Sequence, residues 1–275
     1  MLPPVRTAHL LPELNAEFIQ LLCSLTPAEW DRPATPRWQV RDVTAHLLDG
    51  DIRRLSAGRD GVTLRPDVPI TGFGDLVPWL NRLNAEWVDV ARRMSPPVLV
   101  SLLETTGPQV AEFLASLDDD APALYPVGWA GEDVSPNWMD VGREFTERWH
   151  HQQQIRDAVG RPGLTDARWM RPVLELSMRA LPRAYAAAQV ADGGVLVFHV
   201  EGDGGGWWSL VRVGEGWILR EGDWPDPACV VRMDTDTAWR VLLHVLPPDR
   251  ARGRLSVQGD AALAEPFLQA RAVRV

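Results

Sequence analysis

The sequence contains no lysine, because all 28 basic residues in the 275-residue chain are arginine. The missing amine excludes lysine Schiff-base chemistry and a Walker-type phosphate loop, since both require it. Acidic residues number 37, so the formal net charge is −9. A surface of that sign argues against non-specific binding to nucleic acid or to an anionic membrane, and we expect neither as a partner.

Cysteine is scarce, and the two that occur, Cys23 and Cys229, lie far apart in the sequence. This excludes a disulfide framework and favours the reducing cytoplasm. Cys23 follows two leucines on an apolar helix, so we expect it to be a small core residue. Long hydrophobic runs are also missing: none reaches the roughly 18 residues that span a bilayer, and the N-terminal segment is too poor in apolar residues for a signal peptide.

A hydrophobic fraction of 45% and a charged fraction of 24% are typical of a globular protein, and the length allows two domains. We predict a helical bundle over residues 1–165, a connecting helix over 166–190 and an α+β domain over 191–275. Apolar residues at helical spacing predict an up-down four-helix bundle in the first domain. The helices expected before residue 120 are 7–25, 40–55, 73–94 and 99–117.

The densest group of potential metal ligands lies in residues 143–160, REFTERWHHQQQIRDAVG. At about 100° per residue, Glu147, His151 and Gln154 fall along one stripe of a helix. A Glu and a His four residues apart also occur on exposed helix faces without any function, and for this pair alone that interpretation stays open. A metal site needs a further ligand from elsewhere in the chain.

His46 is the candidate for that ligand. Val43, Leu47 and Leu48 around it predict the buried side of an amphipathic helix. An imidazole in that position costs free energy unless it is hydrogen-bonded or bound to a metal. Two imidazoles and one carboxylate suit a divalent metal, zinc above all, that keeps a position open for water or substrate.

Two phrases together resemble the mycothiol-dependent maleylpyruvate isomerase family: WDRPATPRWQVRDVTAHLLDGD (residues 30–51) and ERWHHQQQIRDAVGRP (residues 147–162). The resemblance implies a first domain of the DinB-like metal-binding type. In that family one His on the second helix, and a Glu and a His four residues apart on a later helix, bind the metal. Those positions correspond here to His46, Glu147 and His151.

Two neighbouring residues are expected to support these ligands. The family usually has an Asp where this chain has Gln154, which puts the supporting role of that position in question. His150 points about 100° away from His151 on a helix, so we expect it behind the ligands or in solvent. The resemblance also implies mycothiol, or a related low-molecular-weight thiol, as the cofactor.

From Gly193 onward, short β-rich runs separated by Gly, Asp and Pro predict an antiparallel sheet. The run GDGGG at 202–206 is interpreted as a hairpin turn, because no helix follows it as a phosphate loop would require. The order of strands and helices resembles the sterol-carrier-like second domain of the same family. His199 and His244 have no partners at ligand spacing, so we expect both to be structural.

Two further features bear on the site. Residues 121–137 form an aromatic loop that either walls the active site or plugs the end of the bundle, and we weigh these equally. Arginines of the second domain could bind a substrate carboxylate by charge-assisted hydrogen bonds, with Arg220 and Arg254 as candidates.

We therefore expect a metal- and thiol-dependent isomerase or S-transferase acting on a small electrophilic substrate that bears a carboxylate, in a monomer or weak homodimer. Two alternatives remain. The first is a metal-dependent hydrolase on the same bundle, in which water takes the place of the thiol. The second is a non-enzymatic carrier of an apolar ligand, which requires a closed cavity lined by Trp207, Trp208 and Trp217.

Overall fold

The structure, a computed structural model, describes residues 2–62, 65–130 and 134–272. These residues form two compact units. Among the described residues, the helical unit contains 7–124 and 147–163, and the α/β unit contains 2–6, 125–146 and 164–272. Helix α5 contributes to both units. The domain boundaries given above are a different division of the chain and stay a prediction.

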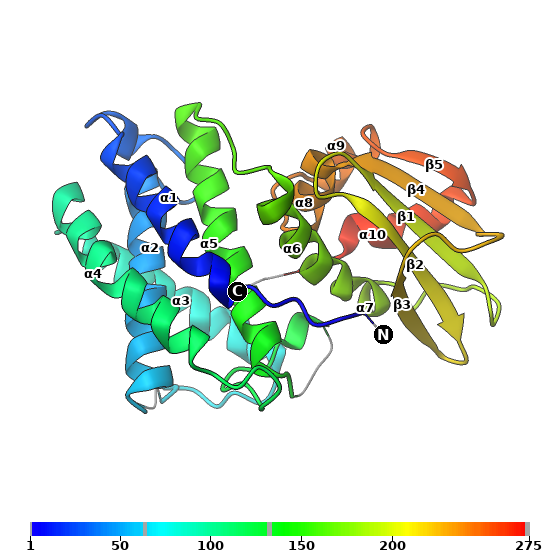
Figure 1. The fold of residues 1–275 in the computed structure, drawn as a ribbon, viewed down its shortest axis with the longest axis horizontal. Coiled ribbons are helices and arrows are strands. Elements are labelled where there is room, and N and C mark those ends of the chain that lie inside the picture. Colours follow the sequence, from blue (N-terminus) through cyan, green and yellow to red (C-terminus); the bar gives the residue numbers. More distant parts are fainter. Residues whose placement is uncertain (1, 63–64, 131–133, 273–275) are drawn as a thin grey trace. The chain divides into compact units, whose positions relative to one another are not determined.

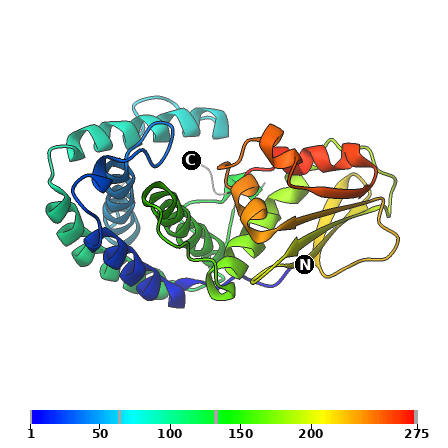
Figure 2. The same cartoon turned by 90° about the horizontal axis from the view of Figure 1, so that it is seen from above.

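Within the described residues, the helical unit is built from five long helices. Figures 1 and 2 show them from two directions. Helix α2 packs against α3 and α4, and α1 packs against α4. Short 3-10 turns occur at Ala8–Leu10 and Glu29–Asp31. The helices are α1 (Leu11–Cys23), α2 (Val40–Arg53), α3 (Phe73–Ala91), α4 (Pro96–Ala115) and α5 (Asn137–Val159), the last entering the unit with its second half.

Local signals explain where α2 begins and how it changes. Gln39 caps its N-terminus in a capping box with Asp42, so each side chain satisfies a backbone amide of the first turn. At its other end α2 passes into a π-helical turn over Arg54–Arg59. Such turns are rare and often occur at functional sites.

A hydrophobic core joins α1, α2 and α5. Val43 and Leu48 of α2 and Ile155 of α5 belong to this core, and all three are fully buried. The indole of Trp87, on α3, donates a 2.8 Å hydrogen bond to the carbonyl of Ala45, which ties α3 to the middle of α2. The core thus includes residues of α2 and of α5, and the Trp87 hydrogen bond fixes α3 against α2.

One expectation for this unit was wrong. Cys23, expected in the core, is exposed at the last position of α1. The core-facing stripe of α1 is instead Leu11, Leu14, Phe18 and the pair Leu21–Leu22. A residue that follows two core leucines on a helix is rotated by about 100° for each step, which carries Cys23 off the buried face.

The α/β unit is a five-stranded sheet with helices along it (Figure 1). The strand order is β3-β2-β1-β4-β5. The strands are β1 (Val195–Glu201), β2 (Gly206–Val213), β3 (Gly216–Glu221), β4 (Cys229–Asp234) and β5 (Ser256–Gly259). The helices are α6 (Ala167–Ser177), α7 (Leu181–Ala184), α8 (Thr235–Leu242), α9 (Pro248–Arg252) and α10 (Glu265–Gln269), with 3-10 turns at Gly128–Ala130, Met178–Ala180 and Ala261–Ala264.

The predicted fold class, a DinB-like helical bundle followed by an α+β domain, is confirmed. All neighbouring strands pair antiparallel except β1 and β4, which are parallel. Phe198 on β1 is fully buried and lies 5.7 Å from Tyr185 and 5.6 Å from Phe267, measured between ring centroids. No described helix is long and apolar enough to cross a membrane.

The GDGGG run forms the turn between β1 and β2. Gly204 there has a φ of +75°, a conformation that L side chains rarely adopt. An added Cβ would lie 2.9 Å from the Cβ of Met170 and 3.0 Å from the backbone nitrogen of Arg171, both on α6. The glycine therefore allows the turn to approach α6 closely.

Candidate metal centre

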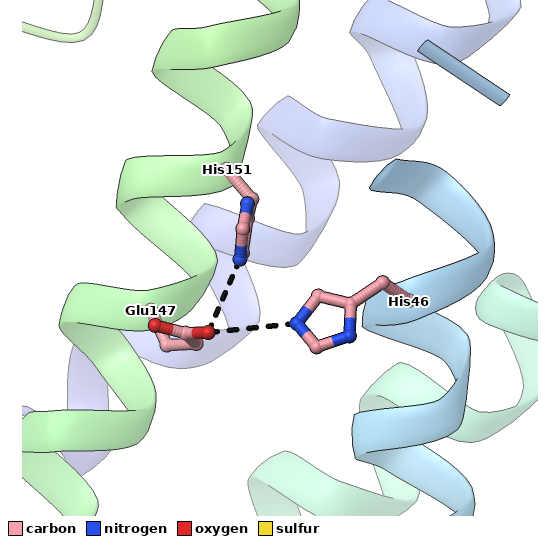
Figure 3. Close-up of side chains that lie close together, drawn as sticks. All are labelled: His46, Glu147 and His151. Carbon is pink, nitrogen blue, oxygen red and sulfur yellow. Dashed lines mark hydrogen bonds and ion pairs between the residues drawn. The ribbon is translucent and has the colours of Figure 1, made fainter. Parts of the chain in front are cut away.

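The three ligand candidates come from two helices of the helical unit. His46 lies in the middle of α2, and Glu147 and His151 lie one turn apart on α5. Figure 3 shows both imidazoles directed at the carboxylate of Glu147. Residues separated by about a hundred positions in the sequence are thus brought together, while the pair on α5 follows from helix periodicity.

The distances within the group are short. Oε1 of Glu147 lies 3.1 Å from Nε2 of His151 and 3.5 Å from Nε2 of His46. One ligand atom from each of the three residues lies within 4.8 Å of the other two. Among the described residues, no other cluster of three His, Cys, Asp or Glu side chains meets this criterion.

This geometry fits a divalent metal. Ligand atoms about 2.1 Å from a zinc ion, at tetrahedral angles, are separated by roughly 3.4 Å. The observed separations from the Glu147 oxygen match that value. The side chains of His46 and His151 are 11% and 10% exposed, whereas Glu147 is 24% exposed. The group is therefore sheltered but open on the carboxylate side, where a further ligand could enter.

Gln154 supports His151 from behind. Its side-chain oxygen lies 2.8 Å from Nδ1 of His151. Because an amide oxygen only accepts hydrogen bonds, the proton of the neutral imidazole is on Nδ1, and Nε2 keeps its lone pair for a metal. His150, expected behind the ligands or in solvent, is buried and stacks on His151 with 5.2 Å between ring centroids.

The charges of the three groups influence one another. Burial alone would raise the pKa of Glu147, but the two histidines lower it well below its ordinary value. Burial lowers the pKa of His46, an effect that outweighs its hydrogen bond to Glu147. For His151, burial opposes the charged form, yet the Glu147 carboxylate raises the pKa overall. The carboxylate is thus ionised and His46 favours the neutral form, as metal binding requires.

Trp38 completes the environment of His46. Its ring lies 5.0 Å from the His46 ring, measured between centroids, and is tilted by 40°. The buried Nδ1 of His46 makes no hydrogen bond to any described residue. A buried polar atom without a partner is costly. A metal on Nε2 would not supply this partner, so Trp38 and Glu147 are the contacts described here that hold the His46 ring.

Three polar residues beside His46 were not identified from the sequence. Arg53, at the end of α2, donates from Nη2 to the side-chain oxygens of Asp49 and of Asn84, the latter on α3. Burial raises the pKa of Asp49, while Arg53 acts to lower it. Asp49 and Arg53 follow His46 by three and seven residues, so helix periodicity could have revealed them. No sequence pattern connects Asn84 to them.

The other candidates belong to the α/β unit. Arg220, on β3, lies over the ring of Trp224 at 5.1 Å, and Arg254 pairs with Asp236 at 3.3 Å. Their roles stay a prediction. His199 stacks on Trp207 at 3.7 Å between centroids.

The remaining histidine and the aromatic loop also have partners in this unit. Nε2 of His244 lies 3.2 Å from the carbonyl of Ala270. In the aromatic loop, the carbonyl of Gly128 accepts a hydrogen bond from Arg183, and residues 131–133 lie outside the described ones. Whether this loop borders the metal centre stays a prediction.

Comparisons with known proteins agree with this architecture. A family model described as "Mycothiol maleylpyruvate isomerase N-terminal domain" matches residues 11–156. The crystal structure of the mycothiol-dependent maleylpyruvate isomerase matches with 14% identity and a TM-score of 0.54, over 94% of this chain and 95% of that chain. A mutant of that isomerase, with one histidine replaced by alanine, matches with 13% identity and a TM-score of 0.53 over the same shares. No curated protein matches the sequence.

Proposed function

The chain belongs to the mycothiol maleylpyruvate isomerase N-terminal domain family, whose model spans more than half of it, and on that premise we propose that it is a thiol-dependent isomerase or S-transferase. The observation that carries the proposal is the convergence of His46 and His151 on one oxygen of Glu147. The proposed cofactor is mycothiol or a related small thiol. The proposed substrate is a small electrophile that bears a carboxylate.

His46, Glu147 and His151 would hold a divalent metal, zinc by preference for this set of ligands. When bound there, the ion supplies the positive charge that favours a thiolate over a thiol at neutral pH. The protein holds the ligands in place: Gln154 orients the ring of His151, and Trp38 shields one side of His46. The partly exposed Glu147 leaves one side of the group accessible.

The proposed chemistry is cis-trans isomerisation of an activated double bond. The thiolate sulfur forms a bond to one carbon of the double bond, and the electron pair moves to the activating carbonyl. Rotation about the resulting single bond follows. Loss of the same sulfur then restores the double bond, so that the thiol is regenerated and nothing is oxidised or reduced.

Metal analysis tests the site. The protein is loaded with zinc, dialysed, and its metal content measured for wild type, His46→Ala and Glu147→Ala. We expect about one zinc in the wild type and strong loss in both variants, because each removes one of three ligands. His9→Ala, which removes an exposed histidine at the N-terminal end, is the matched control. Stoichiometric zinc in both site variants would mean that the proposed site does not exist.

A thiol-dependence assay tests the reaction. Maleylpyruvate is offered to the zinc-loaded protein with and without mycothiol, and isomerisation is followed by absorbance. We expect turnover only when the thiol is present. Turnover without thiol, with water as the reactant, would support the hydrolase alternative instead.

The carrier alternative has weaker support. It needs Trp207, Trp208 and Trp217 to line one cavity. Successive residues of a strand point to opposite faces, so Trp207 lies on the opposite face of β2 from the fully buried Trp208. The indole of the third, Trp217, donates a 2.7 Å hydrogen bond to the carbonyl of Tyr185 within the unit. The three tryptophans therefore do not share one surface.

A further inference from the structure

Arg53 lies on the same side of α2 as the candidate ligand His46. Seven residues, about two helical turns, separate them, so their side chains leave the helix in nearly the same direction. Asp49 lies between them on that side. The guanidinium is thus a neighbour of the metal centre within one unit of the protein.

Buried partners hold the guanidinium in place. Its Nη2 donates to the carboxylate of Asp49 and to the side-chain oxygen of Asn84. Asp49 is 7% exposed and Asn84 5% exposed, and they come from α2 and α3 respectively. Placing two polar side chains in the interior costs free energy unless their hydrogen bonds are satisfied. Two buried polar side chains thus hold a single arginine in one orientation.

The other nitrogens of the Arg53 guanidinium can bind a ligand. Its Nε and Nη1 make no hydrogen bond to any residue within the described ranges, although Nη2 makes two. The side chain is 23% exposed, so a small molecule can reach it. An arginine that is already oriented loses little rotamer freedom on binding, and its N–H groups match carboxylate oxygens.

We propose that Arg53 is the residue of this site that binds the substrate carboxylate, through Nε and Nη1, while Asp49 and Asn84 act as positioning residues. The assignment rests on the proposed function, because it places the carboxylate beside the double bond that the thiol attacks. The ligand class is a small dicarboxylate or keto acid whose second polar end reaches the metal centre. A phosphate dianion of similar size fits this place less well, because the Asp49 carboxylate repels a dianion more strongly than a monoanionic carboxylate.

Arg53 differs in its surroundings from the two arginines suggested by the sequence. Arg254 is 49% exposed and has an exposed carboxylate partner, Asp236. Arg220 is exposed and stacks on Trp224. Neither is held by buried side chains in the interactions described for it, so each must lose more conformational freedom on binding a carboxylate.

Binding of maleate to the zinc-loaded protein, measured by calorimetry, tests the assignment. We expect Arg53→Gln to weaken maleate binding by at least about tenfold, the usual effect of losing a charge-assisted hydrogen bond. Arg53→Lys keeps the charge and should weaken binding less, which guards against a variant that fails to fold. Arg82→Gln removes an exposed, ion-paired arginine of α3 and should leave binding unchanged.

Zinc content is measured on the same samples. A failure of the proposed metal site can therefore be distinguished from a failure of the proposed role of Arg53. If the wild type holds no zinc, the proposed function fails. If zinc is bound and Arg53→Gln binds maleate as tightly as the wild type, the role of Arg53 is overturned while the metal site stands. The role of Arg53 is also overturned if Arg220→Gln or Arg254→Gln loses maleate binding while Arg53→Gln keeps it. It is overturned as well if the zinc-loaded wild type does not bind maleate.

Discussion

Arg148 and Asp51 form a buried ion pair that joins α5 to α2. Their side chains are 5% and 0% exposed. Arg148 directly follows Glu147, and Asp51 lies five residues after His46, so the pair connects the two helices next to the candidate ligands. Asp51 also accepts a hydrogen bond from Thr106 on α4. The ion pair therefore restrains how α2 and α5 slide past each other.

Replacing Arg148 with Met should destabilise the protein strongly. The change removes one partner of a buried ion pair, which typically costs about 3–5 kcal/mol of the free energy of unfolding. Urea denaturation measures the loss. The double variant Arg148→Met with Asp51→Leu should be more stable than Arg148→Met alone, because the buried charge is then removed as well.

Arg252→Met, which breaks an exposed pair with Glu265, is the control for this experiment, and it should change stability little. A similar small effect for Arg148→Met would show that the buried pair does not hold the two helices together.

Gln154→Leu should lower zinc affinity without removing a ligand. The substitution deletes the oxygen that lies 2.8 Å from Nδ1 of His151, and loss of such a supporting contact usually weakens metal binding by about 10- to 100-fold. Competition with a zinc-binding dye measures the affinity. Gln154→Glu, which keeps an accepting oxygen, should retain tight binding. Equal affinity for Gln154→Leu and wild type would remove Gln154 from the site.

The two cysteines should differ in reactivity toward a thiol reagent. Cys23 is exposed, whereas Cys229 is buried on β4. Burial raises the pKa of Cys229 from 9.0 to about 11, and the thiolate is the reactive form. At pH 8 we expect one thiol to be modified in the native protein and two after unfolding. Rapid modification of both in the native state would contradict the burial of Cys229.

The same pKa shift predicts a change of stability at alkaline pH. Because the folded-state pKa of Cys229 is raised, the unfolded chain releases the thiol proton first as the pH rises. The contribution of Cys229 is fully present below pH 9 and declines between about pH 9 and pH 11. Cys229→Ala should show a smaller decline over this range in urea titrations. Parallel curves for wild type and variant would contradict the shift.

Gly204→Ala should be more destabilising than Gly214→Ala. Both glycines have positive φ, +75° and +57°, so both substitutions introduce backbone strain of about 1–2 kcal/mol. At Gly204 the new Cβ also meets α6, while at Gly214 it meets nothing within 4 Å. Thermal unfolding of the two variants isolates the contact with α6. Equal losses would mean that the turn can move away from α6.

Much of the site could be predicted from residue spacing. Glu147 and His151 lie on one face of any helix that contains them, whatever surrounds it. The apolar neighbours of His46 likewise indicated a buried imidazole that needs a partner. The resemblance to the isomerase family then connected the two segments, and the family is confirmed. What binds at these residues stays a prediction.

Other features depended on contacts that spacing does not encode. Where we expected one connecting helix over 166–190, the structure has α6, a 3-10 turn and α7. The parallel pairing of β1 with β4 was not anticipated. The residues of β1 do not indicate which distant strand pairs with the edge that β2 leaves open. Asn84 illustrates the same point at the site, since it meets Arg53 from another helix.

The sequence by itself determined the periodicity of the helices, the alternation of the strands and the placing of two ligands on one helical face, because these follow from local backbone geometry. Only the tertiary structure decided that the His46 imidazole meets Glu147 and that Asn84 meets Arg53. Those meetings depend on how whole helices pack and on how far they slide past one another. The packing of the helices depends on the close fit of many buried side chains from different segments, and no short segment contains that information.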